Sequence, residues 1–460
     1  MSFRNFERTG LDDLWSLHDT SRSLIDFVPE EELEHDDKYA NPNYSSDSMS
    51  QSHPIESPEE IASQVSEPTE NFTTDRNLIL LLSIVSGLAI SNVYYNQPLL
   101  AQIGRNLQVS EHQIGIVPAV TQVGYSIGLL LLVPLGDRLE RRKLIVTVLS
   151  LLVFAIVGVA ISPNLTTLTV ASLALGCLSI VAQLIIPMVA QMSSPLERGK
   201  TLGFLMSGLS VSLVFARTIS GFIGETFGWR SIYWLSAGLI VTLAITVRGK
   251  LPIIPPASKL SYAKLMGSIL QLIREQPILR EASLNIALIF ASFNAFWSTM
   301  IFFLESAYHY DGKVAGLFGL VGIVGALVTP LIGRLADEYT PRKILSYAIA
   351  LALASFAILA IAGTYLSGLI LGVLFLFLGM HSSFILNQIR IYSLVPNAES
   401  RLNTVYMVTN YTGGALGSFL GAVGWSLWQW QGVCTVAISL IGLAAIIHFK
   451  VFSFSKRSVL

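Results

Sequence analysis

Two polar residues lie well inside long apolar stretches of this chain, where burying a charge or a proton donor is costly. Arg217 lies within the stretch 201–223, and His381 lies within 366–389. A guanidinium in an apolar environment must face a wet cavity or meet a partner. Arg217 therefore indicates a site for an anionic group or a counter-charge for Glu305. Extension of its side chain to the nearer membrane surface is the alternative.

His381 is the residue whose chemistry could involve protons. Histidine titrates near neutral pH, and this one is the only histidine well inside an apolar stretch. The acidic residues after residue 76 all lie away from the middle of such stretches, where a proton-relay carboxylate is usually found. If protons take part, the candidates are His381 and Glu305. A neutral histidine that is hydrogen-bonded between helices is the alternative.

Amide and aromatic side chains recur inside the apolar stretches at helical spacing, as in Gln122 and Tyr125 or Asn294 and Trp297. Buried amides must pair or face water. We therefore predict a central cavity, and for any single residue hydrogen bonding between helices is the alternative. The predicted cavity residues are Tyr95, Gln97, Gln122, Tyr125, Arg217, Asn294, Trp297 and Asn410.

Two charged loops of similar sequence lie in the two halves of the chain. The first reads PLGDRLERRK and the second IGRLADEYTPRK, and each lies between two apolar stretches. A carboxylate there can cap the N-terminus of a neighbouring helix, so we predict a gate that such contacts hold shut. The alternative is that these loops only set the orientation of the chain in the membrane, but that role requires Lys and Arg alone and no acidic residue. The predicted gate residues are Asp137, Arg138, Arg141, Arg142, Gly333, Asp337, Arg342 and Lys343.

The composition indicates which structural elements must position these residues. The chain is 52% hydrophobic and 13% charged, with a mean hydropathy of +0.60, whereas soluble proteins carry about 25% charged residues. Apolar stretches of about 20 residues suit a membrane span, and in lipid such a span must be helical. The sequence predicts an all-α membrane protein whose twelve transmembrane helices form two six-helix bundles. The predicted helices cover 77–98, 114–135, 143–161, 167–191, 201–223, 230–248, 282–304, 315–335, 343–363, 366–389, 402–423 and 428–451.

Charge and proline divide the chain further. Residues 1–76 hold 18 acidic and 5 basic side chains and little apolar surface, so we predict a disordered acidic tail in the cytoplasm. The linker 249–281 is predicted to carry an amphipathic helix on the membrane surface. Its apolar face has Leu265, Met266, Ile269, Leu272 and Ile273. The predicted organisation is tail 1–76, bundle 77–248, linker 249–281, bundle 282–452 and a cytoplasmic C-terminus 453–460.

Lysine and arginine placement predicts the orientation. The loops after every second helix and the C-terminus hold 20 basic residues, and the other loops hold 3. Both termini are therefore expected in the cytoplasm of a multi-pass protein, with the plasma (cell) membrane as the expected location. Small residues at close spacing also predict tight helix contacts. The glycines concerned are Gly124, Gly128, Gly316, Gly319, Gly322, Gly325, Gly413, Gly417 and Gly421.

Several kinds of chemistry have no motif in the sequence. It shows no phosphate-binding loop, no metal-ligand cluster and no nucleophile–base set. We therefore expect neither an enzyme nor an ATP-driven pump, no cofactor or metal, and no nucleic-acid partner. The expected partners are a small-molecule substrate and the lipid bilayer, with protons left open, and the expected state is a monomer.

The paired loops resemble the signature loop of the major facilitator superfamily, which reads roughly G-x-L-A-D-R-x-G-R-K. The runs NVYYNQPLL and TQVGYSIGLLLLVPLGD resemble a largely uncharacterised subgroup of permeases that is grouped with drug and sugar efflux transporters. The similarity covers about residues 77–452. It implies a twelve-helix fold, a central cavity between two bundles and alternating access.

Two positions depart from the pattern of proton-coupled efflux members. Ser172 stands where such members carry an arginine, and Arg217 stands where the proline of their fifth-helix motif would be. The first hypothesis is a secondary active transporter that moves a small organic solute outward by alternating access, with proton coupling open. The second is a facilitator or importer of a small metabolite without proton antiport. The third is a membrane receptor or scaffold that signals through the acidic tail.

Overall fold

A computed structural model describes residues 76–193, 198–253, 262–324, 331–332, 335, 339–395 and 399–457. The predicted acidic tail, apart from Arg76, lies outside these residues. So do Gly325, Gly333 and Asp337, together with the side chain of Asp137.

The secondary structure of the described residues is helical throughout. The first half contains α2 Arg76–Ser91, η1 Gln97–Leu99, α3 Leu100–Leu107, α4 Glu111–Ile114, α5 Ile116–Leu132, η2 Pro134–Asp137, α6 Arg141–Ala160, α7 Leu165–Leu178, α8 Val181–Met192, α9 Arg198–Phe227 and α10 Arg230–Lys250. The remainder contains α11 Tyr262–Glu275, α12 Pro277–Tyr308, α13 Gly312–Leu317, η3 Phe318–Val321, α15 Pro341–Ala362, α16 Leu366–Tyr392 and α17 Glu399–Arg457.

Long apolar helices dominate, as the all-α membrane prediction requires. Nine helices within the described residues are long and apolar enough to cross a membrane, and Arg76–Ser91 and Gly312–Val324 are shorter apolar helices. α17 is two helices in geometry, because Trp428 and Gln429 leave helical backbone angles. This kink lies where the sequence predicted a break between two spans. The number twelve stays a prediction, since residues 325–330 lie outside the described chain.

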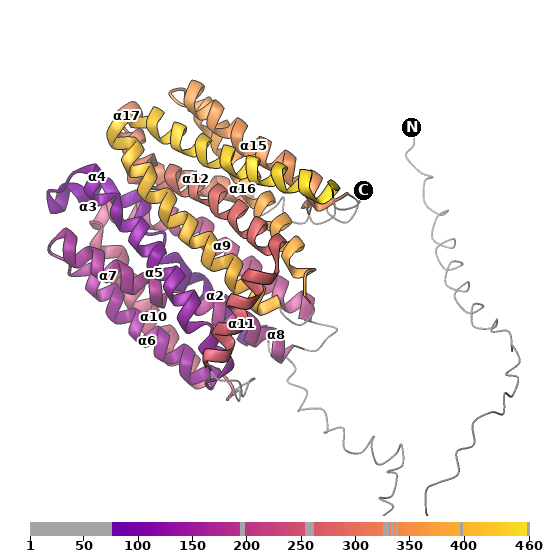
Figure 1. Ribbon diagram of the computed structural model, residues 1–460. Helices are drawn as coiled ribbons and strands as arrows, with labels where there is room; N and C mark the ends of the chain where they lie inside the picture. Colours follow the sequence, from indigo (N-terminus) through magenta and orange to yellow (C-terminus); the bar gives the residue numbers. More distant parts are fainter. Residues whose placement is uncertain are drawn as a thin grey trace, which may run out of the picture. The chain divides into compact units, whose positions relative to one another are not determined.

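The helices of the two halves pack in the same order, which supports a duplicated unit. In the first half α2 packs on α9, α5 on α7 and α6 on α10. In the second half α12 packs on α17, η3 on α16 and α15 on the last part of α17. Each half thus joins its first segment to its fifth, its second to its fourth and its third to its sixth. Figure 1 shows α5, α6, α7 and α10 gathered in one group and α12, α15, α16 and α17 in another.

The first span is interrupted, which differs from the continuous helix predicted over 77–98. α2 ends at Ser91, and the chain winds through Asn92–Asn96 before η1. The backbone N–H of Tyr94 bonds to the carbonyl of Ser91 at 3.0 Å, a tighter i→i−3 pattern than an α-helix has. Pro98 follows within η1 and has no backbone N–H to donate. Irregular backbone at membrane depth is tolerated where protein buries it, and the side chains of this segment are buried.

Glycine contacts confirm the predicted close approach of helices. A Cβ on Gly417 would lie 1.9 Å from the carbonyl oxygen of Ala291 in α12, and one on Gly413 would lie 2.3 Å from that of Ala287. A Cβ on Gly316 would lie 2.6 Å from the carbonyl oxygen of Arg217 in α9. These positions let backbones touch both within one half and between the halves.

The linker carries the predicted helix, α11, which packs on protein through part of its apolar face, and its position at the membrane surface stays a prediction. Ile269 and Leu272 on its apolar side are buried, and the helix contacts α12, α17 and η2. The hydroxyl of Tyr262 donates to the carbonyl oxygen of Leu131 in α5 at 3.1 Å. α11 therefore bridges the two halves of the molecule.

Candidate functional site

A cavity of about 90 Å³ lies between the two halves at the level of Arg217. Tyr94 and Arg217 line it from the first half. From the second half it is lined by Phe290, Phe293, Phe377 and His381. Leu213, Val214 and Met380 also line it, so the cavity is largely apolar, with several aromatic rings and one permanent cation.

Arg217 of α9 is held in the interior, not extended to a membrane surface. Its side chain is 5% exposed, and its Nε donates to Oε1 of Gln97 at 2.7 Å. Its Cζ lies 4.3 Å from the ring centre of Trp297 and 4.6 Å from that of Tyr94. Such cation–π contacts attract a buried guanidinium. Among the described residues, Arg217 has no carboxylate partner.

The predicted pairing of Arg217 with Glu305 is wrong. Glu305 instead forms an ion pair with Arg105 at 2.7 Å, at the far end of α12. This pair is partly exposed to solvent. Because Glu305 pairs with Arg105, it does not offset the cost of burying the Arg217 guanidinium.

A polar bridge joins the two halves beside the cavity. Nε2 of Gln122 in α5 donates to Oδ1 of Asn294 in α12 at 2.7 Å and to Oγ of Ser418 in α17 at 3.3 Å. The Ser298 hydroxyl donates to Ser418 at 2.8 Å. Gln122 and Asn294 therefore form hydrogen bonds between helices, and they do so where the two halves meet.

Five buried polar atoms of the predicted cavity residues have no hydrogen-bond partner among the described residues. They are Nε2 of Gln97, Oε1 of Gln122, the hydroxyl of Tyr125, Nε1 of Trp297 and Oδ1 of Asn410. An unsatisfied buried polar atom costs about 1–3 kcal/mol. Ligand atoms or water can complete the hydrogen bonds of such atoms.

Of the eight predicted cavity residues, only Arg217 lines the cavity within the described chain. Tyr95 and Tyr125 pack against other aromatic rings. Tyr95 packs against Tyr233 in the core of the first half, with ring centres 6.4 Å apart, and lines none of the described cavities. Tyr125 packs on Tyr411, with ring centres 4.2 Å apart. The Tyr411 hydroxyl lies 3.5 Å from that of Tyr94, so Tyr125 supports the cavity wall from behind.

Sequence reasoning missed Tyr94 and the phenylalanines of the cavity. A helical pattern was available for two of them, because Phe290 lies four residues before the predicted Asn294 and Phe293 lies four residues before the predicted Trp297. Tyr94 had no such signal, since the helical period fails where the first span is interrupted.

His381 of α16 lines the same cavity. It is half-buried, its ring stacks on Phe377 with centres 6.0 Å apart, and it has no hydrogen-bond partner within the described chain. The alternative of a neutral histidine fixed by a helix–helix hydrogen bond is therefore not what the structure shows.

One end of the molecule is closed by contacts between the halves, and we call it the closed end. Besides the pair of Arg105 and Glu305, Nε1 of Trp425 donates to Oε2 of Glu111 at 2.6 Å. The hydroxyl of Thr218 donates to the carbonyl of Gly316 at 2.8 Å. Side-chain and backbone contacts thus seal this side of the cavity.

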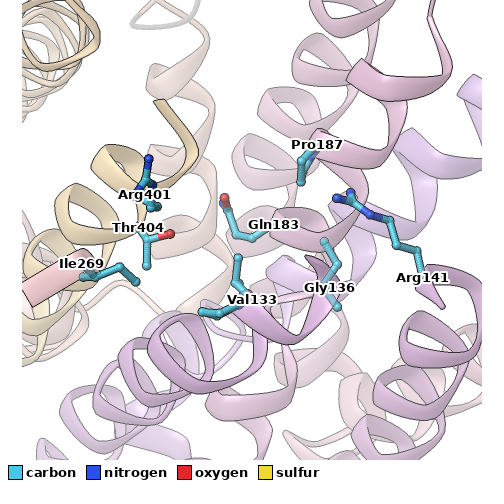
Figure 2. A pocket seen from close by; sticks show the side chains of 10 residues that line it. Val133, Gly136, Arg141, Gln183, Pro187, Ile269, Arg401 and Thr404 are labelled. Carbon is cyan, nitrogen blue, oxygen red and sulfur yellow. The ribbon is translucent and has the colours of Figure 1, made fainter. Parts of the chain in front are cut away.

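The opposite end, which we call the open end, is hollowed between the halves. Two adjoining pockets of about 20 and 210 Å³ share Val133, Gln183, Pro187 and Thr404. Figure 2 shows Arg141 on one side of the smaller pocket and Arg401 on the other, with Gln183 between them. The residues of the first charged loop thus border an opening.

The predicted gate is only partly within the described residues. Arg141 is buried at the start of α6, Arg138 is exposed and Arg142 is half-buried. Arg342 donates to the carbonyl of His448 at 2.9 Å, and Lys343 is exposed. Since Gly333, Asp337 and the Asp137 side chain are not described, the acid–base contacts of the gate stay a prediction.

A buried ionic cluster in the second half was not foreseen. Glu281, at the start of α12, is 4% exposed and forms a two-pronged ion pair with Arg390 of α16. Nδ1 of His448 lies 3.6 Å from the same carboxylate. Arg390 also donates to Asn387 at 3.1 Å, and Asn387 donates to Asn285 at 3.0 Å. The only signal in the sequence was an acid and a base next to long apolar runs.

Comparisons with known proteins agree with this architecture. The family model of the Major Facilitator Superfamily matches residues 79–422. The chain is 36% identical to the "Putative uncharacterized transporter YgaY" of Escherichia coli K12, over 80% of this chain and 94% of that protein. It is 23% identical to the "Probable sugar efflux transporter" of Helicobacter acinonychis, over 71% of this chain and 82% of that protein.

A solved structure has the same fold at low sequence identity. It is a bacterial homologue of the human lysosomal transporter Spinster in an inward-facing and occupied conformation. The TM-score is 0.64 at 14% identity, over 81% of this chain and 96% of that one. At this identity the likeness concerns the fold alone.

Proposed function

The chain belongs to the major facilitator superfamily, and on that premise we propose that its central cavity carries a small organic solute across the membrane by alternating access. As a member, it is a multi-pass integral membrane protein and a transporter, a kind of protein that is not an enzyme. The proposal concerns where the solute binds and how the two halves move around it.

The observation that supports this mechanism is the asymmetry of the cavity. The cavity at Arg217 lies between the halves, sealed on one side by the contacts of Arg105, Glu111 and Thr218, whereas pockets open on the other. The halves meet through α5 with α17 and through α9 with α13. Glycine at these contacts offers flat surfaces on which helices can rock.

Direction and orientation are further parts of the proposal. The excess of basic residues supports an open end in the cytoplasm, so the described state is inward-facing, with both termini on that side. The name of the Helicobacter relative, a probable sugar efflux transporter, supports outward transport. His381 at the cavity supports proton coupling. We also propose a monomer in the plasma membrane.

Alternating access can be tested without knowing the solute. A reporter cysteine is introduced at Leu213, which lines the cavity, after Cys177 and Cys434 have been replaced by serine. In the free protein, an impermeant maleimide should reach the reporter from each side of the membrane. When Arg105→Cys and Glu305→Cys are cross-linked at the closed end, labelling should persist only from the open end.

The matched control carries the reporter with Arg105→Cys alone, which cannot form the cross-link. Equal labelling from one side only, with and without the cross-link, would contradict alternating access. Loss of the cross-link's effect after reduction confirms that the disulfide causes it.

A second candidate function is a facilitator or importer without proton antiport. The observation that favours it is the absence of Asp and Glu among the described residues that line the three pockets around the solute path. Transport that persists after the proton gradient is collapsed distinguishes it from antiport.

A further inference from the structure

We propose that the solute is an organic anion with a planar apolar body, and that Arg217 binds its acidic group. This inference rests on the proposed function and names the class of solute that the same cavity accepts. Three features of the described residues carry it: the donors around Arg217, the charge along the path and the aromatic lining.

Two residues in contact with Arg217 carry hydrogen-bond donors that have no acceptor among the described residues. Its Nε is satisfied by Gln97, but the aromatic rings of Tyr94 and Trp297 supply no oxygen to its terminal nitrogens. Because arginine only donates, the oxygen of the Gln97 amide must face Nε, which leaves Nε2 of Gln97 as a donor without an acceptor. Nε1 of Trp297 is a second such donor.

Donors that lack acceptors around one buried cation match the oxygens of an anion. A carboxylate has two oxygens that each accept hydrogen bonds, and a guanidinium can bind both in its plane. A neutral hydroxyl group would leave the charge of Arg217 uncompensated. A buried charge without a partner is costly, so an anion gains free energy there that a neutral solute does not.

Among the described residues, the permanently charged side chains that line the path to this point are all basic. Arg141 and Arg401 line the pocket at the open end, and Arg217 lines the cavity. No Asp or Glu lines these pockets within the described chain. A cleft lined by one sign of charge concentrates the opposite ion, which here is an anion.

The lining also limits the body of the solute. Phe290, Phe293 and Phe377 surround the cavity, and few of its residues offer polar atoms. Aromatic rings favour a planar apolar group that stacks on them or meets their edges. A sugar would need many more donors and acceptors than this wall provides, so the lining favours an aromatic acid over a sugar.

The test measures binding to the purified full-length protein by calorimetry. The probes are benzoate, 4-hydroxybenzoate, 1-naphthoate and indole-3-acetate, each paired with its neutral primary amide, and lactose as a neutral sugar. We expect at least one acid to bind ten-fold or more tightly than its amide. Arg217→Gln should weaken the binding of that acid at least ten-fold, and Arg217→Lys should weaken it less because the charge remains.

Arg230→Gln is the matched control. Arg230 also contacts a tryptophan ring, with its Cζ 4.2 Å from the ring centre of Trp229, but it lines none of the described cavities. Acid binding should be unchanged in this variant. Trp297→Phe keeps an aromatic ring and removes the indole donor, so it should weaken the acid several-fold and leave amide binding unchanged. This variant tests the site if Arg217→Gln does not fold.

The proposal is overturned if no acid binds, if amides or lactose bind as tightly as the acids, or if Arg217→Gln binds the acid like the unmodified chain. Its failure is distinguishable from failure of the proposed function. Two-sided labelling of the cysteine at position 213 would still show alternating access if only the solute class were wrong.

Discussion

At the scale of single residues, the molecule buries two arginines in opposite ways. Arg390 meets the carboxylate of Glu281 in a nearly dry contact, whereas Arg217 meets aromatic rings and an amide. A closed ion pair fixes structure, because both charges are satisfied within the protein. An arginine without a counter-ion stays available to an external anion. The same residue type is therefore structural at the end of one half and, in our proposal, a binding group between the halves.

Glu281→Gln should destabilise the protein strongly. The change leaves Arg390 and its neighbourhood with a buried positive charge and no carboxylate, and breaking a buried pair in this way costs about 3–5 kcal/mol. Thermal unfolding in detergent measures the loss. Glu275→Gln, whose carboxylate bonds the exposed side chain of Gln271, is the matched control and should change little. A melting temperature of Glu281→Gln equal to that of the control would show that the cluster does not hold the second half together.

His381→Gln tests the proton hypothesis. Glutamine has a similar size but does not titrate, so transport that depends on a pH gradient should become independent of it, while solute binding persists. Flux in proteoliposomes with and without the gradient gives the result. His112→Gln, at an exposed position in α4, is the control. Gradient-driven transport that survives in His381→Gln would exclude this histidine as the coupling group.

At the scale of elements, the period of the apolar pattern predicts helices well and interruptions poorly. The break between predicted spans at 423–428 agrees with the kink at Trp428, because an apolar run had to reverse there. The interruption before Pro98 was not predicted, since Asn92 and Asn96 are as compatible with the polar end of a helix as with an irregular segment. That error explains the choice of Tyr95 over Tyr94. In a continuous helix, Tyr95 would have faced the cavity. The tighter winding of the interrupted segment turns Tyr94 toward the cavity instead.

The candidate site could be predicted where burying a polar group costs free energy unless the group is paired. Gln97, Gln122, Arg217 and Asn294 all lie at the contact of the two halves, as the cost of burying amides and charges requires. The aromatic wall could not be predicted in the same way, because phenylalanine is equally stable in a core or toward lipid. Which phenylalanines face a cavity depends on helix rotation, and apolar composition does not fix rotation in a membrane.

Gly417→Val tests the contact of α12 and α17. A Cβ at this position meets the backbone of Ala291, which cannot move as a side-chain tip can, so we expect a loss of about 1–3 kcal/mol from overpacking. Thermal unfolding in detergent is the measurement. Gly442→Val, in the second of the two helices of α17, is the matched control, since its Cβ would have no atom within 4 Å. Similar melting temperatures for the two variants would show that the close approach is not required.

At the scale of the whole molecule, the closed end must hold the halves together without preventing their separation. The contact of Arg105 and Glu305 is partly exposed, and such pairs are worth up to about 1 kcal/mol. The neighbouring contact of Trp425 with Glu111 is more sheltered. A set of weak contacts suits a transporter, because two conformations of similar free energy can then exchange. A latch built from one strong buried pair would trap one state.

The ion pair at this end should therefore shift the conformational equilibrium in a reversible way. Glu305→Arg places two like charges in contact, so the closed end should open more often, and a cysteine at position 213 should be labelled faster from that side. A change of up to about 1–2 kcal/mol corresponds to roughly a five- to thirty-fold change in population.

The charge swap Arg105→Glu with Glu305→Arg should restore the original labelling rate, because the pair is re-formed with its partners exchanged. Arg230→Glu reverses the charge of a basic residue whose hydrogen bonds, to Asn106 and Ser162, stay within the first half, and it is the control. Faster labelling in Glu305→Arg that the swap does not reverse would mean that the substitution disturbs packing, and that the two charges do not hold the halves together.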